Sequence, residues 1–151
     1  MPRLALDSPL GRLTLVEEEG ALAALDWRDT SDDDEPTPLL LEARRQLDGY
    51  FAGTRAAFDL PLAPRGAAFE RRVWQLMAEI PYGETRRYGE LARALAAPAR
   101  AVGKACGRNP LPILIPCHRV LAAGGALGGY SGGVGVDTKR RLLILERSLL
   151  V

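Results

Sequence analysis

A break rich in proline and glycine divides this 151-residue chain into two halves of different character. The break consists of three residues that interrupt regular secondary structure: Pro61, Pro64 and Gly66. Residues 1–62 carry 6 Lys and Arg against 13 Asp and Glu, a net charge of −7, whereas residues 63–119 carry 10 against 4, a net charge of +6. Because pattern and charge change together, we expect two domains, residues 1–62 and residues 63–151.

The uneven charge also limits the choice of partners. Residues 120–151 add a further +2, so the basic residues gather in the second half although the whole chain carries only +1. Lys and Arg on one side of a molecule favour a polyanion, because they release counterions from its phosphates. An ordinary solvated surface is the alternative interpretation of the same charges.

The first half has the pattern of a small antiparallel sheet covered by one helix. Residues 4–7 and 12–16 favour strands, and the turn Ser8-Pro9-Leu10-Gly11 between them predicts a hairpin. Residues 21–27 can add a third strand, and the acidic stretch 29–35 is typical of a solvated loop. Apolar residues then recur at near-helical spacing over residues 39–51, which predicts a helix packed on the sheet.

The second half is mostly helical, so the chain as a whole belongs to the α+β class. Apolar residues at helical spacing predict a helix over residues 69–80. Two short helices, residues 88–95 and 99–106, have the dimensions of a helix-turn-helix. Residues 110–116 contain three prolines and should be extended. A glycine-rich loop, residues 124–135, precedes a last, leucine-rich helix.

The cysteines and the histidine limit the possible chemistry. The chain has 2 cysteines, Cys106 and Cys117, and 1 histidine, His118. Two cysteines are too few for a disulfide framework, and a single histidine argues against a conventional zinc site. We therefore expect reduced thiols and no bound metal.

The hydrophobic content points to a globular protein outside the membrane. The chain is 47% hydrophobic and 26% charged, which is enough to form a substantial core. No window approaches the roughly eighteen consecutive apolar residues of a membrane span. The N-terminus also lacks the basic segment and apolar run of a secretion signal. We therefore expect a cytoplasmic protein with no membrane partner.

Cys117 is the candidate nucleophile. A thiol attacks strongly only as a thiolate, and Pro116-Cys117-His118-Arg119 places a base and a positive charge beside it. Neighbours in a strand point to opposite faces, so His118 can act on Cys117 only if the backbone turns at Pro116 or a water bridges them. Glu146, among the leucines of the last helix, is a candidate to orient the imidazole. The alternative is a buried structural cysteine beside a histidine that satisfies a hydrogen bond.

Residues 115–120, IPCHRV, resemble the active-site signature of the O6-alkylguanine-DNA alkyltransferases, and Asn109-Pro110 stand at the expected distance upstream. The resemblance continues in the same order along nearly the whole chain. Its further motifs are SPLG at 8–11, YFxG at 50–53, VW at 73–74, IPYGET at 80–85, Tyr88, RAVG at 100–103, GYSGG at 129–133 and KxxLLxxE at 139–146. Matches this specific leave little room for a purely structural Cys117.

The resemblance implies a small N-terminal domain similar to ribonuclease H, without the activity of that enzyme, and a helical C-terminal domain that holds the helix-turn-helix. It also implies that residues 99–106 enter the minor groove of double-stranded DNA, where Ala99, Ala101 and Gly103 allow a close approach. The damaged base must leave the stack before a protein sulfur can reach it. Arg100 would then fill the gap in the duplex.

The same resemblance implies a role for each active-site residue. Cys117 accepts the alkyl group, His118 acts as the base through a bridging water, and Glu146 orients the histidine. Asn109 braces the active-site turn, while Tyr88 crowds the 3′ phosphate and helps to protonate the leaving guanine. A thioether replaces an ether, which consumes the nucleophile. The protein would therefore act once per molecule, irreversibly and stoichiometrically, as a monomer without a cofactor.

Recognition of the extruded base is implied for two further parts of the chain. Tyr130 and Ser131 resemble the lid over the base, and the backbone carbonyls of Cys117 and Val120 would read the exocyclic amine of guanine. Some relatives bind zinc in the N-terminal domain. This chain has no cysteine or histidine before Cys106, so we expect that feature to be missing.

Three other classes compete with this hypothesis. An alkyltransferase-like protein recognises lesions without a nucleophilic cysteine, so Cys117 argues against it. A helix-turn-helix transcription regulator would bind a specific duplex sequence and form no covalent product. A cysteine hydrolase would turn over repeatedly on esters or peptides. Mass spectrometry after mixing the protein with O6-methylguanine DNA separates these classes.

Overall fold

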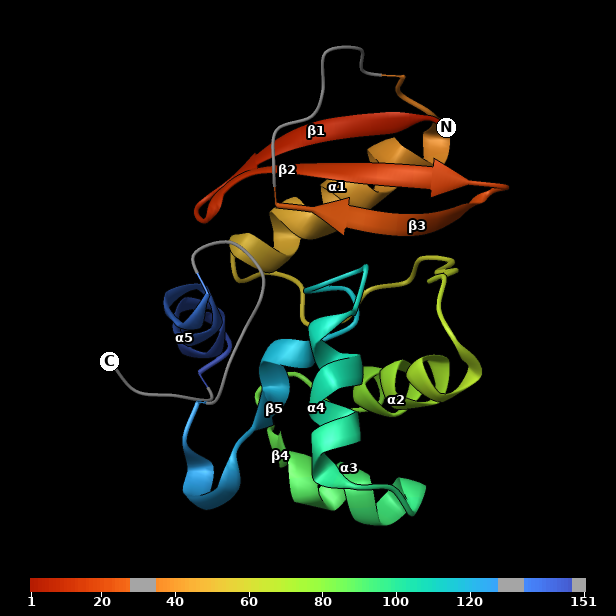
Figure 1. Cartoon of the computed structure of the whole chain (residues 1–151). Coiled ribbons are helices and arrows are strands. Elements are labelled where there is room, and N and C mark those ends of the chain that lie inside the picture. Colours follow the sequence, from red (N-terminus) through yellow and green to blue (C-terminus); the bar gives the residue numbers. More distant parts are fainter. Residues whose placement is uncertain (28–34, 128–134, 148–151) are drawn as a thin grey trace. The chain divides into compact units, whose positions relative to one another are not determined.

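The computed structural model describes residues 1–27, 35–127 and 135–147. The chain forms two compact units, Met1–Arg65 and Gly66–Val151. The first holds an antiparallel sheet and one helix, and the second is mostly helical, so the α+β class expected from the sequence is confirmed (Figure 1). Residues 29–34 of the expected acidic loop lie outside the described residues.

The first unit contains a three-stranded antiparallel sheet in the order β1-β2-β3. Its strands are β1 (Arg3–Ser8), β2 (Gly11–Glu18) and β3 (Ala21–Asp26). Ser8 pairs with Gly11 across the first turn, and Ser8 Oγ accepts a hydrogen bond of 3.1 Å from the backbone N–H of Leu10. Gly11 adopts a φ of +112°, which favours glycine and closes the turn. The predicted hairpin and third strand are both present.

One helix, α1 (Pro38–Phe51), lies across one face of this sheet (Figure 1). Thr37 caps its start, because Thr37 Oγ1 accepts a hydrogen bond of 3.1 Å from the backbone N–H of Leu40. Pro38 suits the first turn, where a backbone N–H has no helical partner. The face toward the core buries four apolar side chains: Leu40, Ala43, Leu47 and Tyr50.

The chain after α1 returns to the edge of the sheet. The backbone N–H of Leu22 donates to the carbonyl of Pro61, and the carbonyl of Leu22 accepts from Ala63, both at 2.9 Å. Leu22 and Leu62 form a parallel bridge. This pairing joins residues 61–63 to the sheet, within the first unit, Met1–Arg65.

The second unit is built mainly from four helices among its described residues: α2 (Ala68–Ala78), α3 (Tyr88–Leu95), α4 (Ala99–Gly107) and α5 (Val136–Leu145). The predicted helix-turn-helix is present, since α3 has the expected bounds and α4 is one residue longer. Ala96, in the left-handed conformation with a φ of 51°, ends α3, and Pro98 caps α4. Residues 96–98 therefore form the whole connection between the two helices.

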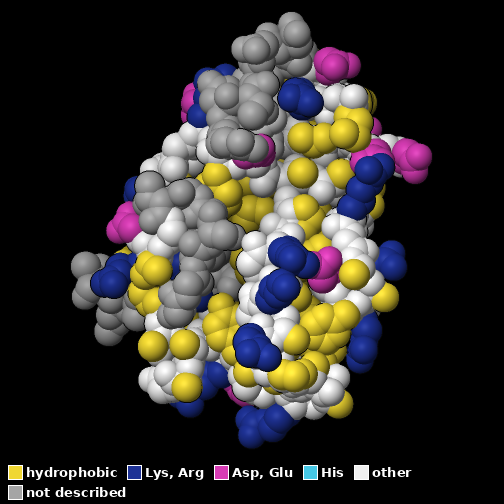
Figure 2. Space-filling model, in the orientation of Figure 1, with side chains coloured by type: hydrophobic (Ala, Val, Ile, Leu, Met, Phe, Trp, Pro, Cys, Tyr) yellow, Lys and Arg dark blue, Asp and Glu magenta, His cyan; other side chains and the backbone are white. Residues whose placement is uncertain are grey.

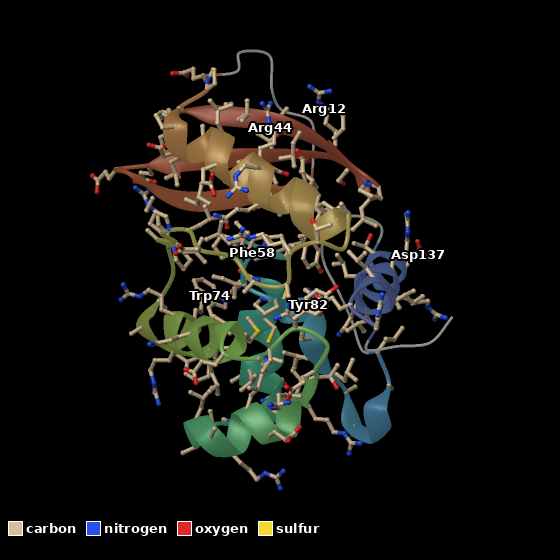
Figure 3. All side chains as sticks on the ribbon, turned by 180° about the vertical axis from the view of Figure 1, so that it is seen from behind. Arg12, Arg44, Phe58, Trp74, Tyr82 and Asp137 are labelled. Carbon is tan, nitrogen blue, oxygen red and sulfur yellow. The ribbon has the colours of Figure 1, made fainter. Side chains whose placement is uncertain are left out.

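Packing within the second unit fixes α4 against its neighbours. Trp74 on α2, labelled in Figure 3, donates a hydrogen bond of 2.8 Å from Nε1 to the backbone carbonyl of Ala105. A Cβ at Gly66 would lie 2.4 Å from the Trp74 ring, so the first residue of this unit must be small. Two short strands, β4 (Arg86–Arg87) and β5 (Val120–Leu121), pair in parallel and join the region before α3 to the segment after Cys117.

Candidate active site

Cys117 begins a single turn of 3-10 helix, η1 (Cys117–Arg119), directly after Pro116. Its side chain is buried, with the residue 8% exposed. The sequence left open whether the backbone turns at Pro116 or a water bridges Cys117 and His118. The backbone does turn here, because the η1 turn replaces a regular strand.

The segment before Cys117 is not extended, and that expectation is wrong. The backbone N–H of Ile115 donates to the carbonyl of Leu111 at 2.8 Å, and Ile113 adopts a φ of +73°. Prolines cannot donate ladder hydrogen bonds, so the chain reverses locally instead of joining a sheet. The reversal delivers Cys117 at the end of a compact turn.

Asn109 holds this turn with both ends of its side-chain amide. Its Nδ2 donates a hydrogen bond of 2.8 Å to the carbonyl of Ile115, and its Oδ1 accepts one of 2.9 Å from the backbone N–H of Leu111. Asn109 comes directly after Arg108, the C-cap residue of α4. It therefore links the end of α4 to the turn that carries Cys117.

His118 and Glu146 meet in the interior, although 28 residues separate them in the sequence. His118 is 0% exposed and Glu146 is 1% exposed, and His118 Nε2 lies 2.7 Å from Glu146 Oε2. A carboxylate at Nε2 favours the neutral tautomer with its hydrogen there, which leaves Nδ1 as an acceptor. His118 Nδ1 is buried and has no hydrogen-bond partner among the described residues. Burial lowers the pKa of His118, although Glu146 acts in the opposite direction.

Arg119, which the sequence offered only as a positive charge beside Cys117, belongs to the same cluster through Glu146. Its Nε donates to Glu146 Oε1 at 2.8 Å and its Nη2 to Glu146 Oε2 at 3.0 Å. A third hydrogen bond of 2.6 Å runs from Nη1 to the carbonyl of Ile80. Arg119 directly follows His118 in the sequence, but this position does not predict Glu146 as its partner.

Lys139 on α5 is a residue that the sequence analysis left without a role. It is fully buried, and its Nζ donates a hydrogen bond of 2.7 Å to the carbonyl of Val120 and lies 5.8 Å from the centre of the Tyr88 ring. Burial lowers the pKa of Lys139, whereas negative charge on Cys117 acts in the opposite direction. Its spacing to Glu146 places both on one helical face, which is the signal that could have found it.

Tyr88 and Cys106 lie within electrostatic range of Cys117. Burial, with a smaller contribution from negative charge on Cys106 and Cys117, raises the pKa of Tyr88 to about 12. Burial is also the main cause that raises the pKa of Cys106 to about 12. The Cys106 sulfur lies 3.3 Å from the sulfur of Met77. Cys106 is therefore protonated at neutral pH, which makes it a poor nucleophile.

A cleft of about 1040 Å³ opens beside the helix-turn-helix. Its lining includes four of the residues singled out from the sequence: Tyr88, Ala99, Arg100 and Gly103. Arg86, Arg87 and Arg93 also line it, and Figure 2 shows Lys and Arg side chains gathered over α3 and α4. Ala101 is half-buried and does not line this cleft. The cleft therefore combines a basic rim with small residues on α4.

The groups expected to read the extruded base are described only in part. The carbonyl of Cys117 accepts from the backbone N–H of Val120, and the carbonyl of Val120 accepts from Lys139. Each carbonyl oxygen has a second lone pair with which it can accept from a ligand. Tyr130 and Ser131 lie outside the described residues.

The described residues contain neither a candidate metal site nor a candidate membrane span. No three His, Cys, Asp or Glu side chains there are grouped so that they could hold a metal ion. No helix in residues 1–27, 35–127 or 135–147 has the length and apolar character needed to cross a bilayer.

Sequence comparison matches both units to one family. Residues 4–64 match the family described as "6-O-methylguanine DNA methyltransferase, ribonuclease-like domain", and residues 68–148 match its "DNA binding domain". A constitutive methylated-DNA--protein-cysteine methyltransferase of Bacillus subtilis is 44% identical over 93% of this chain and 92% of its own length. A methylated-DNA--protein-cysteine methyltransferase of Mycolicibacterium paratuberculosis is 47% identical over 94% of this chain and 90% of its own length.

Solved structures give the same result. The crystal structure of Mycobacterium tuberculosis OGT in complex with DNA superposes with a TM-score of 0.87 at 46% identity, covering 98% of this chain and 94% of that one. An O6-methylguanine DNA methyltransferase from Methanococcus jannaschii superposes with a TM-score of 0.70 at 29% identity over 98% of this chain and 95% of its own. The chain therefore belongs to the 6-O-methylguanine DNA methyltransferase family.

Proposed function

We propose that this protein repairs double-stranded DNA by moving the alkyl group of O6-alkylguanine onto the sulfur of Cys117. The observation that carries the proposal is the thiol of Cys117 beside a buried His118–Glu146 pair, in a chain that matches the family over both units. Relatives at 44% and 47% identity are named methylated-DNA--protein-cysteine methyltransferases, which supports the same reaction here.

In the proposed reaction, His118 serves as the base and Glu146 orients it. With Nε2 held by Glu146, the unpartnered Nδ1 can accept a hydrogen bond from a water, through which the Cys117 proton reaches the ring. The sulfur then attacks the alkyl carbon, a carbon–sulfur bond forms, and the bond from that carbon to O6 breaks. Tyr88, whose pKa is raised to about 12, keeps its proton at neutral pH and can donate it to the leaving guanine.

The product explains why the protein would act once. A thioether is not hydrolysed under mild conditions, so the alkyl group stays on Cys117 and the nucleophile is lost. The transfer is therefore irreversible and stoichiometric, and it uses no cofactor. The protein can do this as a monomer, because Cys117, His118 and Glu146 come from one chain.

In this proposal the C-terminal domain, residues 63–151, binds DNA and holds the active site. Residues 1–62 form the separate ribonuclease-like domain. In this proposal α4 enters the minor groove of the DNA. The small residues Ala99, Ala101 and Gly103 let the backbone of α4 approach the DNA closely. Arg100 fills the space that the extruded base leaves in the duplex. The basic lining of the cleft beside α3 and α4 supports contacts with phosphates.

Two further parts of the proposal concern the extruded base and the place of action. Tyr130 and Ser131 close over the base, and the carbonyls of Cys117 and Val120 accept from its exocyclic amine. Asn109 stabilises the turn that precedes Cys117 through its hydrogen bonds to Ile115 and Leu111. The cytoplasmic location belongs to the same proposal.

The test compares the two cysteines by mass spectrometry after mixing with duplex DNA that contains one O6-methylguanine. The wild-type protein and Cys106→Ala should each gain one methyl group, and Cys117→Ser should gain none while still binding the duplex. Cys106→Ala is the matched control, because it also removes a buried thiol. Methyl transfer to Cys117→Ser would refute the proposed acceptor, and repeated turnover by the wild type would refute the single-use reaction.

A further inference from the structure

The Glu146 carboxylate contacts nitrogen atoms of both His118 and Arg119 in the interior. Its Oε2 lies 2.7 Å from His118 Nε2 and also accepts from Arg119 Nη2 at 3.0 Å. Its Oε1 accepts from Arg119 Nε at 2.8 Å. Arg119 therefore holds both oxygens in a forked contact, and His118 shares one of them.

Arg119 is itself fixed from two other directions. Its Nη1 donates to the carbonyl of Ile80 at 2.6 Å, and its guanidinium lies 5.8 Å from the centre of the Tyr82 ring. The side chain is only 7% exposed. A planar guanidinium anchored in this way sets the plane of the carboxylate that it grips, which a lysine ammonium cannot do.

This arrangement determines which proton His118 carries. The charged groups that act on His118 are Glu146 at the C-terminal end of α5, Lys139 on α5 and Arg119 beside it in η1. The thiol of Cys117 precedes it in the chain. Because Arg119 pairs with the carboxylate, Glu146 remains an anion and an acceptor. The hydrogen of the neutral ring then lies on Nε2, between the two residues, and Nδ1 stays available.

We propose that Arg119 is a positioning residue of the alkyl transfer: its forked contact with Glu146 holds the carboxylate so that His118 keeps its hydrogen on Nε2 and presents Nδ1 as the acceptor. This inference rests on the proposed function, in which His118 is the base. Arg119 touches neither the alkyl group nor Cys117 in this role, and it acts only through Glu146.

The tautomer of His118 can be measured directly, because the chain has 1 histidine. Protein labelled with ¹⁵N-histidine gives one imidazole signal set, whose two nitrogen shifts report the tautomer and the charge of that ring. The transfer rate is measured in single turnover with free O6-benzylguanine, which requires no DNA binding. The variants are Arg119→Lys, which keeps the charge but loses the fork, and Arg119→Met, which loses both.

A matched control lies in the first unit. Arg45 forms the same forked contact with Glu42, with Nε to Oε1 at 2.8 Å and Nη2 to Oε2 at 2.6 Å, on the surface of α1. Arg45→Lys and Arg45→Met should leave both the His118 signals and the transfer rate unchanged. They show what the loss of a forked arginine does when it lies outside the active site.

We expect wild-type His118 to be neutral at pH 7, with its hydrogen on Nε2. Arg119→Lys should mix the two tautomers and slow transfer about tenfold, part of the roughly 10²- to 10⁴-fold that general-base catalysis contributes. Arg119→Met should slow it further and raise the pKa of His118, because a neighbouring positive charge is lost. Both variants should shift the acid limb of the rate profile or lower its plateau.

Three outcomes would overturn the inference. The first is transfer at the wild-type rate in Arg119→Met with the Nε2–H tautomer intact. The second is a wild-type ring protonated on Nδ1 at pH 7, which requires no variant and so decides the matter even if Arg119→Met does not fold. The third is equal slowing by the Arg45 variants. A wild-type protein without any transfer would instead refute the proposed function. The imidazole spectra of wild type and the Arg119 variants would still test whether Arg119, through Glu146, sets the tautomer of His118.

Discussion

His118 Nε2 lies 2.7 Å from Glu146 Oε2, and neither side chain reaches solvent. The burial of His118 makes the interior of the second unit sensitive to pH, because it lowers the pKa of His118 below its ordinary value of 6.5, although the contact with Glu146 acts in the opposite direction. In the unfolded chain that ring takes up a proton as the pH falls through about 6.5, whereas in the folded protein it does so only at lower pH.

Acid should therefore weaken the fold through His118. As the pH falls below 6.5 the free energy of unfolding should decrease by up to about 1.4 kcal/mol per pH unit, until the folded pKa is reached. Thermal melts at pH 7.5, 6.5 and 5.5 measure this slope, and His118→Gln should lose it over the same range. An equal slope in wild type and His118→Gln would assign the effect to other groups.

Asn109→Ala should destabilise the protein and slow transfer together. The change removes two hydrogen bonds and leaves buried backbone groups of Leu111 and Ile115 without them, at a cost of about 1–3 kcal/mol. Gln46→Ala is the matched control, because the Gln46 amide also bridges two backbone groups, both of Asp59. The control should melt at lower temperature but keep the wild-type transfer rate at temperatures where it is folded. Equal slowing of both variants would mean that stability alone sets the rate.

Arg100→Ala should impair repair of duplex DNA more than reaction with free O6-benzylguanine. Arg100 is exposed on α4 and lines the cleft beside Tyr88, away from the buried His118–Glu146 pair. Only the duplex contains a base that must be extruded, so only that substrate needs a side chain to fill the gap. Single-turnover rates on both substrates give the comparison, with Arg72→Ala on α2 as an exposed control. Equal losses on both substrates would place Arg100 in the chemistry or in folding.

Alkylation of Cys117 should lower the melting temperature. Cys117 is buried in a turn clamped by Asn109, so added atoms must displace neighbours. Overpacking costs about 1–3 kcal/mol, which corresponds to a fall of roughly 2–8 °C for a chain of this size. A benzyl adduct should melt lower than a methyl adduct. Thermal melts of fully reacted protein, checked by mass spectrometry, test this prediction. An unchanged or higher melting temperature would falsify the hypothesis that the turn around Cys117 has no room for the added atoms.

Much of the fold could be predicted because it depends on neighbours in the chain. The bounds of α3 follow from a local device, since the Glu90 side chain accepts from the backbone N–H of Arg87 at 2.7 Å one turn earlier. The hairpin likewise depends on the turn between Ser8 and Gly11. Short-range contacts of this kind are encoded in spacing and residue type, which the sequence displays directly.

The nucleophile and its base could also be found from the sequence, because Cys117 and His118 are adjacent and stand in a specific motif. What surrounds them was decided by the tertiary structure. Ile113 adopts a φ of +73° in the chain reversal. Isoleucine rarely adopts this conformation, so its residue type could not predict the turn. The contacts of Glu146 with His118 and Arg119 span 28 and 27 residues.

The physical reason is that a buried charge is tolerated only where the fold supplies its partner. Glu146 and Lys139 look misplaced on the apolar face of α5 when the helix is considered alone. Packing of α5 beside η1 brings Arg119 and His118 to the carboxylate and the carbonyl of Val120 to the ammonium. The sequence thus determined the helices, the hairpin and the reactive thiol, whereas the pairing of buried charges around that thiol exists only in the folded chain.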